Sequence, residues 1–184
     1  MINEQEIIDG CKAGKEKYQK LLYQLFSDML MGICLRYAKN EMEAEDILHD
    51  SFIKIYTKIG SYRGEGSLKA WVRQITVNTA INAYKKKIAK GFDVDIDEIE
   101  ESIKDVTVVD SDATTLKMLL NFINELPDGY RAAFNLYEIE GYSHKEIAEM
   151  LGCSPVTVRT QLFKAKQALK KKIENYLKNN LETL

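Results

Sequence analysis

The sequence predicts an all-α fold of two small helical domains joined by an acidic flexible linker, with a helix-turn-helix in the second domain. Apolar residues recur at the 3.6-residue period of an amphipathic helix over long stretches of the chain. Only two prolines occur in 184 residues, and proline is the residue that most strongly breaks a helix. Long helical periods with few breaks therefore favour helices in both domains.

The formal net charge of −2 hides an uneven distribution of charge along the chain. Residues 1–90 carry 11 Asp and Glu against 15 Lys and Arg, residues 91–112 carry 9 against 1, and residues 113–184 carry 8 against 10. We therefore predict two basic domains, 1–90 and 113–184, with the linker at 91–112. The linker is either a solubilising tether or an acidic segment that lies in a basic channel of a partner in place of nucleic acid.

Four or five helices are expected in the first domain. The first spans about residues 4–13 and the second about 15–37. Asn40 and Glu43 have the spacing of a capping box, so a third helix should follow and end near Ile59. The buried stripe of this helix is predicted to be Ala44, Ile47, Leu48, Ser51, Phe52 and Ile55. Its acidic residues lie mainly off that stripe, at Glu41, Glu45, Asp46 and Asp50.

A loop of sequence SYRGEGS precedes a helix expected over residues 68–90. The core stripe of this helix is predicted to be Leu68, Val72, Ile75 and Thr79. Within an arc of about 60° beside it lie Trp71, Gln74, Asn78 and Lys85. An aromatic ring among amides and lysines can hold unstacked bases, because the ring stacks, amides bond base edges and lysine neutralises phosphate. The alternative is that Trp71 is simply a core residue.

The second domain should begin with helices over residues 114–126 and 128–140, separated by Pro127. The segment GYSHKEIAEMLGCSPVTVRTQLFKAK, from Gly141, then predicts a helix-turn-helix. Ser143 and Glu146 form a capping box that starts its first helix at about His144. Gly152 ends that helix, because glycine takes the left-handed conformation at low cost. Ser154 caps the second helix and Pro155 occupies its first position.

The second helix of this unit has two different faces. Its apolar face is predicted to be Val158, Leu162, Ala165 and Leu169. The opposite face holds Val156, Thr160, Phe163, Lys164 and Gln167. Hydroxyls and amides bond base edges in a major groove, lysine contacts phosphate, and apolar groups contact the thymine methyl. The alternative is a solvated face, but an exposed Phe163 favours DNA binding. The run Lys170-Lys171-Lys172 could extend the phosphate contacts or form an ordinary solvated helix end.

Other functional classes find little support in the sequence. No apolar run approaches the roughly twenty residues of a membrane span, and the first residues lack the order of a signal peptide, so a cytoplasmic protein is expected. Cys11, Cys34 and Cys153 have unrelated spacings and are expected to be reduced and structural. With His49 and His144 far apart, we expect no metal site, and no catalytic motif or cofactor site is recognised.

Three segments in order resemble the bacterial RNA polymerase sigma factors of the extracytoplasmic-function (ECF) type. They are AEDILHDSFIKIY (44–56), YRGEGSLKAWVRQITVNTAINAYKKK (62–87) and LPDGYRAAFNLYEIEGYSHKEIAEMLGCSPVTVRTQLFKAKQAL (126–169). The resemblance covers nearly the whole chain. It implies a non-enzymatic protein that binds core RNA polymerase, recognises the −35 and −10 promoter elements and promotes DNA melting. It also implies an anti-sigma factor as a partner, which can itself be membrane-bound, with no membrane insertion of this chain.

The first domain resembles sigma region 2, and the resemblance implies two binding surfaces on it. The β′ clamp coiled coil of the polymerase would contact Glu45, Asp46, His49 and Asp50, although the family usually has Gln in place of His49. The −10 element would contact Tyr62, Arg63, Ser67, Lys69, Trp71, Gln74, Asn78 and Lys85. One base would be flipped into a pocket built by the loop, and Asn78 is the best candidate for a contact with that base.

The second domain resembles sigma region 4, which implies that it binds the −35 element and the β flap. The predicted −35 contacts are Val156, Thr157, Arg159, Thr160, Phe163 and Lys164. Family members commonly carry Arg where this chain has Gln161, Lys164 and Lys166. Since lysine cannot bond guanine through two parallel hydrogen bonds, we expect more reliance on phosphate contacts and DNA shape.

The main rival is a helix-turn-helix regulator whose first domain senses a ligand or dimerises. It would leave the surface of Trp71 and Asn78 without a role. An enzyme that acts on nucleic acid is a more distant alternative, because no metal-binding carboxylate pair or nucleophile is recognised.

Overall fold

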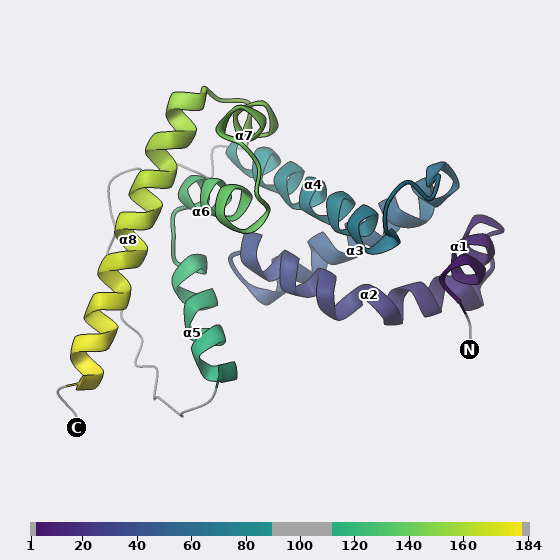
Figure 1. Cartoon of the computed structure of the whole chain (residues 1–184), viewed down its shortest axis with the longest axis horizontal. Coiled ribbons are helices and arrows are strands. Elements are labelled where there is room, and N and C mark those ends of the chain that lie inside the picture. The colour runs from purple at the N-terminus through teal and green to yellow at the C-terminus, as the bar shows by residue number, and fades with distance from the viewer. Residues whose placement is uncertain (1–2, 90–111, 182–184) are drawn as a thin grey trace. The chain divides into compact units, whose positions relative to one another are not determined.

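The computed structural model describes residues 3–89 and 112–181, and within these ranges it contains helices and no strand (Figure 1). The chain divides into two compact units, Met1–Ala83 and Tyr84–Leu184. The predicted all-α class with two helical domains is therefore confirmed. The predicted linker at 91–112 lies outside the described residues, except for Asp112, where helix α5 begins. The boundaries of the three predicted segments remain a prediction.

The first unit is built on the long helix α2 (Glu16–Tyr37), which packs against α1 (Glu4–Lys12) on one side and α3 (Glu41–Lys58) on another. A short 3-10 helix η1 (Ile59–Ser61) follows α3, and the long helix α4 (Leu68–Ala89) begins after the loop. The side chains of Leu22, Leu30, Ile55, Leu68 and Val72 are fully buried and form the centre of the core.

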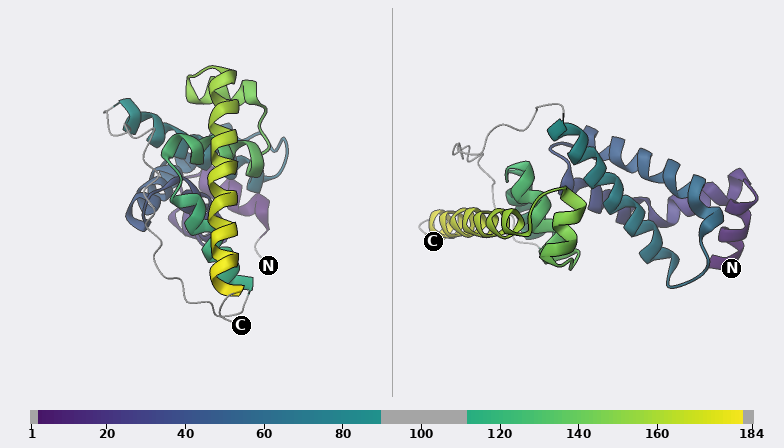
Figure 2. Two further views of the ribbon diagram at one scale, coloured as in Figure 1. Left: turned by 90° about the vertical axis from the view of Figure 1, so that its left-hand side faces the viewer. Right: turned by 90° about the horizontal axis from the view of Figure 1, so that it is seen from above.

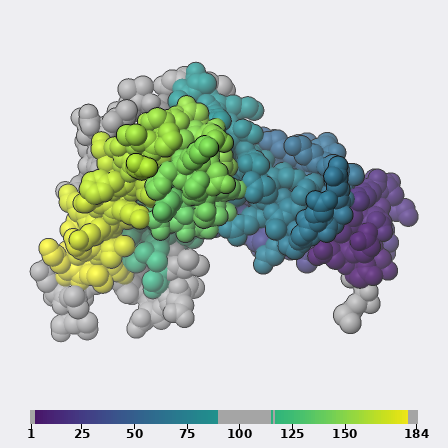
Figure 3. Space-filling view, turned by 45° about the horizontal axis from the view of Figure 1, so that its top comes forward, coloured from purple at the N-terminus to yellow at the C-terminus, as the bar shows by residue number. Residues whose placement is uncertain are grey.

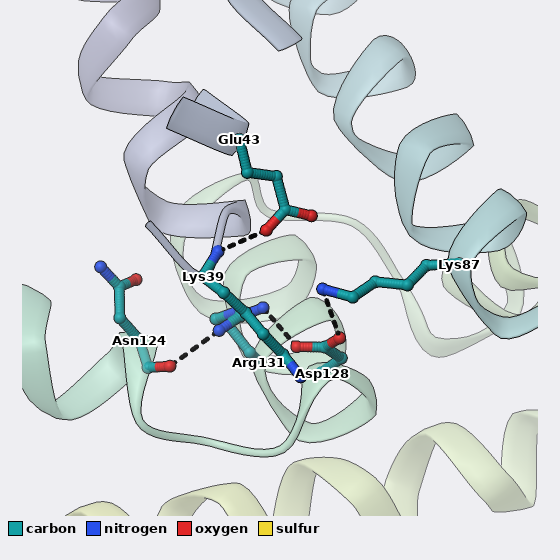
Figure 4. A network of polar contacts seen from close by, with 6 residues as sticks. All are labelled: Lys39, Glu43, Lys87, Asn124, Asp128 and Arg131. Carbon is teal, nitrogen blue, oxygen red and sulfur yellow. Dashed lines mark hydrogen bonds and ion pairs between the residues drawn. The ribbon is translucent and has the colours of Figure 1, made fainter. Parts of the chain in front are cut away.

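The predicted buried stripe of α3 is confirmed at all of its positions. Asn40 caps this helix, since its side-chain oxygen accepts a hydrogen bond from the Glu43 backbone N–H at 2.8 Å. The Glu43 carboxylate bonds the Lys39 backbone N–H at 2.7 Å instead of the N–H of Asn40 (Figure 4). The reciprocal bond of the predicted capping box is thus displaced by one residue toward the N-terminus.

The buried face of α4 differs from the predicted stripe. Ile75 is only half-buried, whereas Thr76 and Val77 are buried. The buried arc is centred near Thr76, so Ile75 lies at its edge, beside Trp71. The prediction of Ile75 as a core residue was therefore wrong by a partial turn of the helix.

The second unit contains α5 (Asp112–Asn124), α6 (Asp128–Phe134), α7 (His144–Leu151) and the long helix α8 (Pro155–Leu181). Figure 2 shows α8 as one uninterrupted helix, in side view and nearly end-on. Leu126, Tyr130, Ala165 and Leu169 form a buried apolar cluster that joins α6 to α8.

A buried polar pair fixes the start of α6. The Arg131 guanidinium pairs with the Asp128 carboxylate, and both residues are 2% exposed (Figure 4). Arg131 also donates to the backbone carbonyl of Asn124 at 2.7 Å. This bond satisfies a carbonyl at the end of α5, where a helix leaves such groups without intrahelical partners.

The predicted helix over residues 128–140 is not uniform. After α6 the backbone widens into a π-helical turn, η2 (Asn135–Ile139), in which the Glu140 N–H donates to the Asn135 carbonyl at 2.9 Å. A π turn accommodates one more residue than an α turn and is rare outside single-turn insertions. The turn changes which side chains of this segment reach α8.

No helix within residues 3–89 or 112–181 has both the length and the apolar character needed to cross a membrane. Cys11, Cys34 and Cys153 are unpaired in the described residues, and their reduced state remains a prediction. Cys11 and Cys34 are buried, and burial raises the pKa of the Cys34 thiol to about 12.

Candidate nucleic-acid interface

The turn between α7 and α8 has the predicted helix-turn-helix geometry. The Ser143 hydroxyl accepts from the Glu146 N–H at 3.3 Å, and the Glu146 carboxylate accepts from the Ser143 N–H at 2.8 Å, which confirms the capping box. These hydrogen bonds hold the pKa of Glu146 below its usual value. Gly152 has φ of 74° and ends α7. Ser154 caps α8, since its hydroxyl accepts from the Thr157 N–H at 3.0 Å.

The two predicted faces of α8 are confirmed. Val158 and Ala165 are completely buried and Leu162 is 6% exposed, and this side of α8 packs against α6 and α7. On the other side, Val156 is 67% exposed and Phe163 is 61% exposed. In the space-filling view of Figure 3, α7 (green) and α8 (yellow-green to yellow) form adjoining parts of one surface. All the predicted −35 residues are exposed, namely Val156, Thr157, Arg159, Thr160, Phe163 and Lys164.

The exposed polar groups of α8 have defined hydrogen-bonding roles. The Thr160 hydroxyl donates to the Val156 carbonyl at 3.1 Å, so its oxygen keeps lone pairs that can accept from an amino group of adenine or cytosine. The Lys164 ammonium lies 5.9 Å from the ring centroid of Tyr130, which is a cation–π distance. This contact links the exposed face of α8 to Tyr130 of α6.

The π turn contributes a contact that sequence reasoning missed. The Lys166 ammonium lies 2.7 Å from the carboxylate of Glu138 and 5.7 Å from the ring centroid of Tyr137. Tyr137 also packs against His144, with ring centroids 4.6 Å apart. Lys166 therefore ties α8 to the turn before α7. No sequence signal distinguishes this π turn from a continued α-helix.

The acidic face of α3 also carries exposed apolar side chains, which were not among the predicted features of this face. The predicted polymerase-binding residues are all exposed, namely Glu45, Asp46, His49 and Asp50. Met42 is 74% exposed and Ile53 is 47% exposed. Met42, Asp46, His49 and Ile53 follow the helical spacing of a single stripe. Apolar residues therefore flank the acidic groups, and this spacing was available in the sequence as a signal.

Four predicted reading residues lie on one side of α4, namely Trp71, Gln74, Asn78 and Lys85, whereas Lys69 lies on the opposite side. Gln74 and Asn78 are exposed, and the Gln74 side-chain amide donates to the Asn78 side-chain oxygen at 3.4 Å. Trp71 is half-buried, with its ring centroid 5.3 Å from that of Tyr62. Trp71 is thus partly packed in the core and partly accessible to a nucleic-acid base, so its burial is compatible with each of its two predicted roles. Lys69 is exposed and Lys85 is half-buried.

The loop before α4 supplies the other predicted −10 residues. Arg63 and Ser67 are exposed, but Tyr62 is 6% exposed. The Tyr62 hydroxyl donates to the Gly66 carbonyl at 2.8 Å. The Ser67 hydroxyl accepts from the Ala70 N–H at 3.1 Å and so caps the start of α4. Tyr62 therefore supports the loop from inside, a role that the sequence did not suggest.

Within the two described ranges, no group of three or more His, Cys, Asp or Glu side chains is arranged to hold a metal ion. The basic and aromatic groups of α4 and α8 are the chemically distinctive features of the described surface.

Comparison with known proteins identifies both units. Residues 22–88 match the family described as Sigma-70 region 2, and residues 116–169 match the family described as Sigma-70, region 4. The RNA polymerase sigma-H factor of Pseudomonas aeruginosa is 28% identical over 188 residues, which span 95% of this chain and 96% of that protein. The ECF RNA polymerase sigma-E factor of Haemophilus influenzae is 27% identical over 183 residues, which span 94% of this chain and 96% of that protein.

A solved structure is also similar in fold. It is the sigma factor RpoE in complex with the anti-sigma factor NepR from Bartonella quintana, with a TM-score of 0.51 and 24% identity. The similarity covers 84% of this chain and 96% of that chain.

Proposed function

This chain belongs to the ECF sigma factors, and from that premise we propose that it binds core RNA polymerase, directs it to promoters by recognising −35 and −10 elements, and promotes DNA melting. The observation that carries this proposal is the exposed face of α8, where Val156 and Phe163 are more than half exposed beside polar side chains. Apolar side chains beside hydroxyl and basic groups on one helix face match what a major groove offers, which is thymine methyl groups, base edges and phosphates. The chain acts in the cytoplasm as an initiation factor and not as an enzyme.

In this proposal the second domain, residues 113–184, contacts the −35 element through α8. The apolar side chains of Val156 and Phe163 contact thymine methyl groups, and Thr160 accepts a hydrogen bond from a base amino group. Arg159 and Lys164 contact phosphate or base edges. Thr157, at the first turn of α8, lies beside the capped helix start. The same domain binds the β flap of the polymerase.

The first domain, residues 1–90, contacts the polymerase and the −10 element by different helices. The acidic face of α3 binds the β′ clamp coiled coil, with Met42 and Ile53 as apolar neighbours of the charged groups. The −10 contacts come from Arg63, Ser67, Lys69, Trp71, Gln74, Asn78 and Lys85, and Tyr62 acts through the loop that it supports. The acidic linker at 91–112 joins the two domains, so that two weak contacts act together.

At the −10 site, contacts with the flipped base must offset the free energy that flipping costs. Removal of a base from the stack costs a few kcal/mol, and stacking on an aromatic ring returns about 1–3 kcal/mol per base. Trp71 can supply the ring, and Asn78 can bond the base edge once its contact with Gln74 opens. An anti-sigma factor that covers these surfaces would block initiation.

The proposal is tested by runoff transcription with purified core RNA polymerase, this protein and a library of promoters from its own genome. We expect discrete new start sites that share −35 and −10 motifs. Duplex DNA binding without core binding or initiation would instead support the regulator.

The variant Asn78→Ala tests the assigned −10 surface separately. We expect it to lower open-complex formation with little loss of core binding, and Gln24→Ala, at an exposed amide on α2, is the matched control. An equal fall in core binding would contradict the assigned role of Asn78.

A further inference from the structure

The loop between η1 and α4 is closed by a hydrogen bond within itself. The Tyr62 hydroxyl donates to the Gly66 carbonyl at 2.8 Å, so that Arg63, Gly64 and Glu65 lie within the closed turn. Gly64 has φ of 78° and Gly66 has φ of 85°, which are conformations that other residues adopt at a cost. All three residues inside the turn are exposed. The hydrogen bond therefore fixes the path of a segment whose side chains face outward.

Tyr62 is itself held from two further directions. Its ring packs against Trp71 of α4, with centroids 5.3 Å apart. Its backbone carbonyl accepts a hydrogen bond from the Lys12 ammonium at 3.0 Å. Lys12 is the last residue of α1, and α1 is anchored in the core by buried side chains that include Ile8 and Cys11.

The contact from α1 lies outside the family match. The residues that match Sigma-70 region 2 begin at residue 22, whereas α1 ends at Lys12. The hydrogen bond thus joins an element beyond the matched segment to the loop that precedes the α4 reading surface. A charged donor makes a stronger bond to a carbonyl than a neutral one does.

We propose that Lys12 and Tyr62 are positioning residues that preset the loop at residues 62–67 and thereby set base discrimination at the −10 element. This inference rests on the proposed function, because the loop matters to specificity only if α4 and the loop contact promoter DNA. A loop with two glycines has a large conformational entropy to lose on binding. If the loop is already ordered in the free protein, this entropy cost is not part of the free energy of DNA binding. A base that does not fit is then rejected because the loop cannot adjust its shape to it.

Lys12 has one competing role, which is direct contact with a DNA phosphate. A phosphate contact weakens binding about equally for all sequences when it is removed, and it changes the salt dependence by roughly one counterion. A positioning role changes the ratio between matched and mismatched −10 sequences and leaves the salt dependence unchanged. The two roles are therefore separable by measurement.

The test uses the full chain with four substitutions. Tyr62→Phe removes the bond to Gly66 but keeps the ring, Lys12→Met removes the ammonium but keeps the apolar stem, and Lys12→Arg keeps a charged donor. Lys15→Met is the matched control, at an exposed lysine whose side chain makes no cap hydrogen bond. Hydrogen exchange of loop amides is measured in the free protein. Core binding and open-complex formation are measured on a promoter and on versions with one changed −10 base.

We expect Tyr62→Phe and Lys12→Met to speed loop exchange and to reduce discrimination against the changed base by about tenfold, the scale of one lost base-pair preference. Core binding should change less than about twofold, and Lys12→Arg should restore most of the discrimination. Lys15→Met should resemble the wild type in every measurement.

Two outcomes would overturn the inference in distinguishable ways. If the wild type forms open complexes and both variants keep its discrimination, the positioning role fails while the proposed function stands. The positioning role fails in the same way if Lys12→Met changes only the salt dependence. If the wild type neither binds core polymerase nor opens promoters, the proposed function fails and the inference fails with it.

Discussion

The surfaces of α8 and α4 differ in how far the side chains at their centres are engaged within the protein. On α8, Phe163 and Val156 project into solvent, and the polar contact of Thr160 is a local one to its own helix backbone. On α4, Gln74 bonds Asn78 and Trp71 rests against Tyr62. We expect α8 to bind duplex DNA without rearrangement, whereas α4 must exchange internal contacts for contacts with bases. The surface of α4 therefore suits bases that become accessible only after the duplex opens.

The largest expected effect separates the folding of the two units. Val158→Asp introduces a charge at a completely buried position, and an uncompensated buried charge costs about 3–5 kcal/mol. We expect the second unit to lose its fold while the first keeps its helices, as measured by limited proteolysis and NMR. The control is Val156→Asp, at a position 67% exposed, which should change stability by less than about 0.5 kcal/mol. Loss of both units together would show that they fold as one.

A smaller effect is expected at the turn of the helix-turn-helix. Gly152 has φ of 74°, and a residue with a Cβ atom in this conformation costs about 1–2 kcal/mol. Gly152→Ala should lower the free energy of unfolding by that amount in denaturant titration. Gly60→Ala is the control in the first unit, because Gly60 has no positive φ and open space at its Cβ position. Equal destabilisation by both substitutions would contradict the assigned role of the backbone conformation.

The helix caps provide a matched comparison between the units. Ser143→Ala and Asn40→Ala each remove a side-chain cap, and each should destabilise by about 1 kcal/mol. They should differ in their response to acid. Because the folded-state pKa of Glu146 is lowered by Ser143, its contribution is present above the unfolded pKa and is lost as pH falls through the folded pKa. An NMR titration should show the Glu146 pKa returning toward 4.5 in Ser143→Ala. No movement of that pKa would exclude the capping box as its cause.

The smallest effect on stability is expected on α4. Gln74→Ala removes an exposed contact between residues four apart, which is worth about 0.2–0.5 kcal/mol. Denaturant titration should therefore barely distinguish it from the wild type. Because Gln74 is also a proposed −10 contact, open-complex formation should fall although the stability stays nearly unchanged. A loss of more than about 1 kcal/mol would show that the amide pair is part of the structural framework.

Local signals in the sequence were sufficient for most of the helix ends. Residues only a few positions apart determine the cap at Ser143, the left-handed conformation of Gly152 and the two different faces of α8. The buried stripe of α3 was predictable for the same reason.

Features that depend on distant residues were not predictable. The bond from Lys12 to the Tyr62 carbonyl joins residues 50 positions apart, and the Tyr62 ring is buried against Trp71 of the next helix. The π turn at Asn135–Ile139 places Glu138 and Tyr137 against Lys166, although its apolar pattern is also compatible with an α-helix. The half-burial of Ile75 depends on which neighbours α4 meets, and the spacing of its own residues does not determine this.

Because α8 is one continuous helix, a change of tilt at one end displaces the other end. A helix of 27 residues is about 40 Å long, since each residue adds about 1.5 Å. Its first turns carry the exposed Val156 and Thr160. Toward its other end, Tyr176 packs edge-on against Phe122 of α5, and the Lys172 ammonium lies 2.6 Å from the carboxylate of Glu125, which follows α5. From Val156 to Lys172 the helix measures about 24 Å, so a tilt of about 5° at the contact with α5 would move the first turn by about 2 Å. Because Val158 and Leu162 also bury the reading end against α6 and α7, its alignment depends on packing at both ends of the helix.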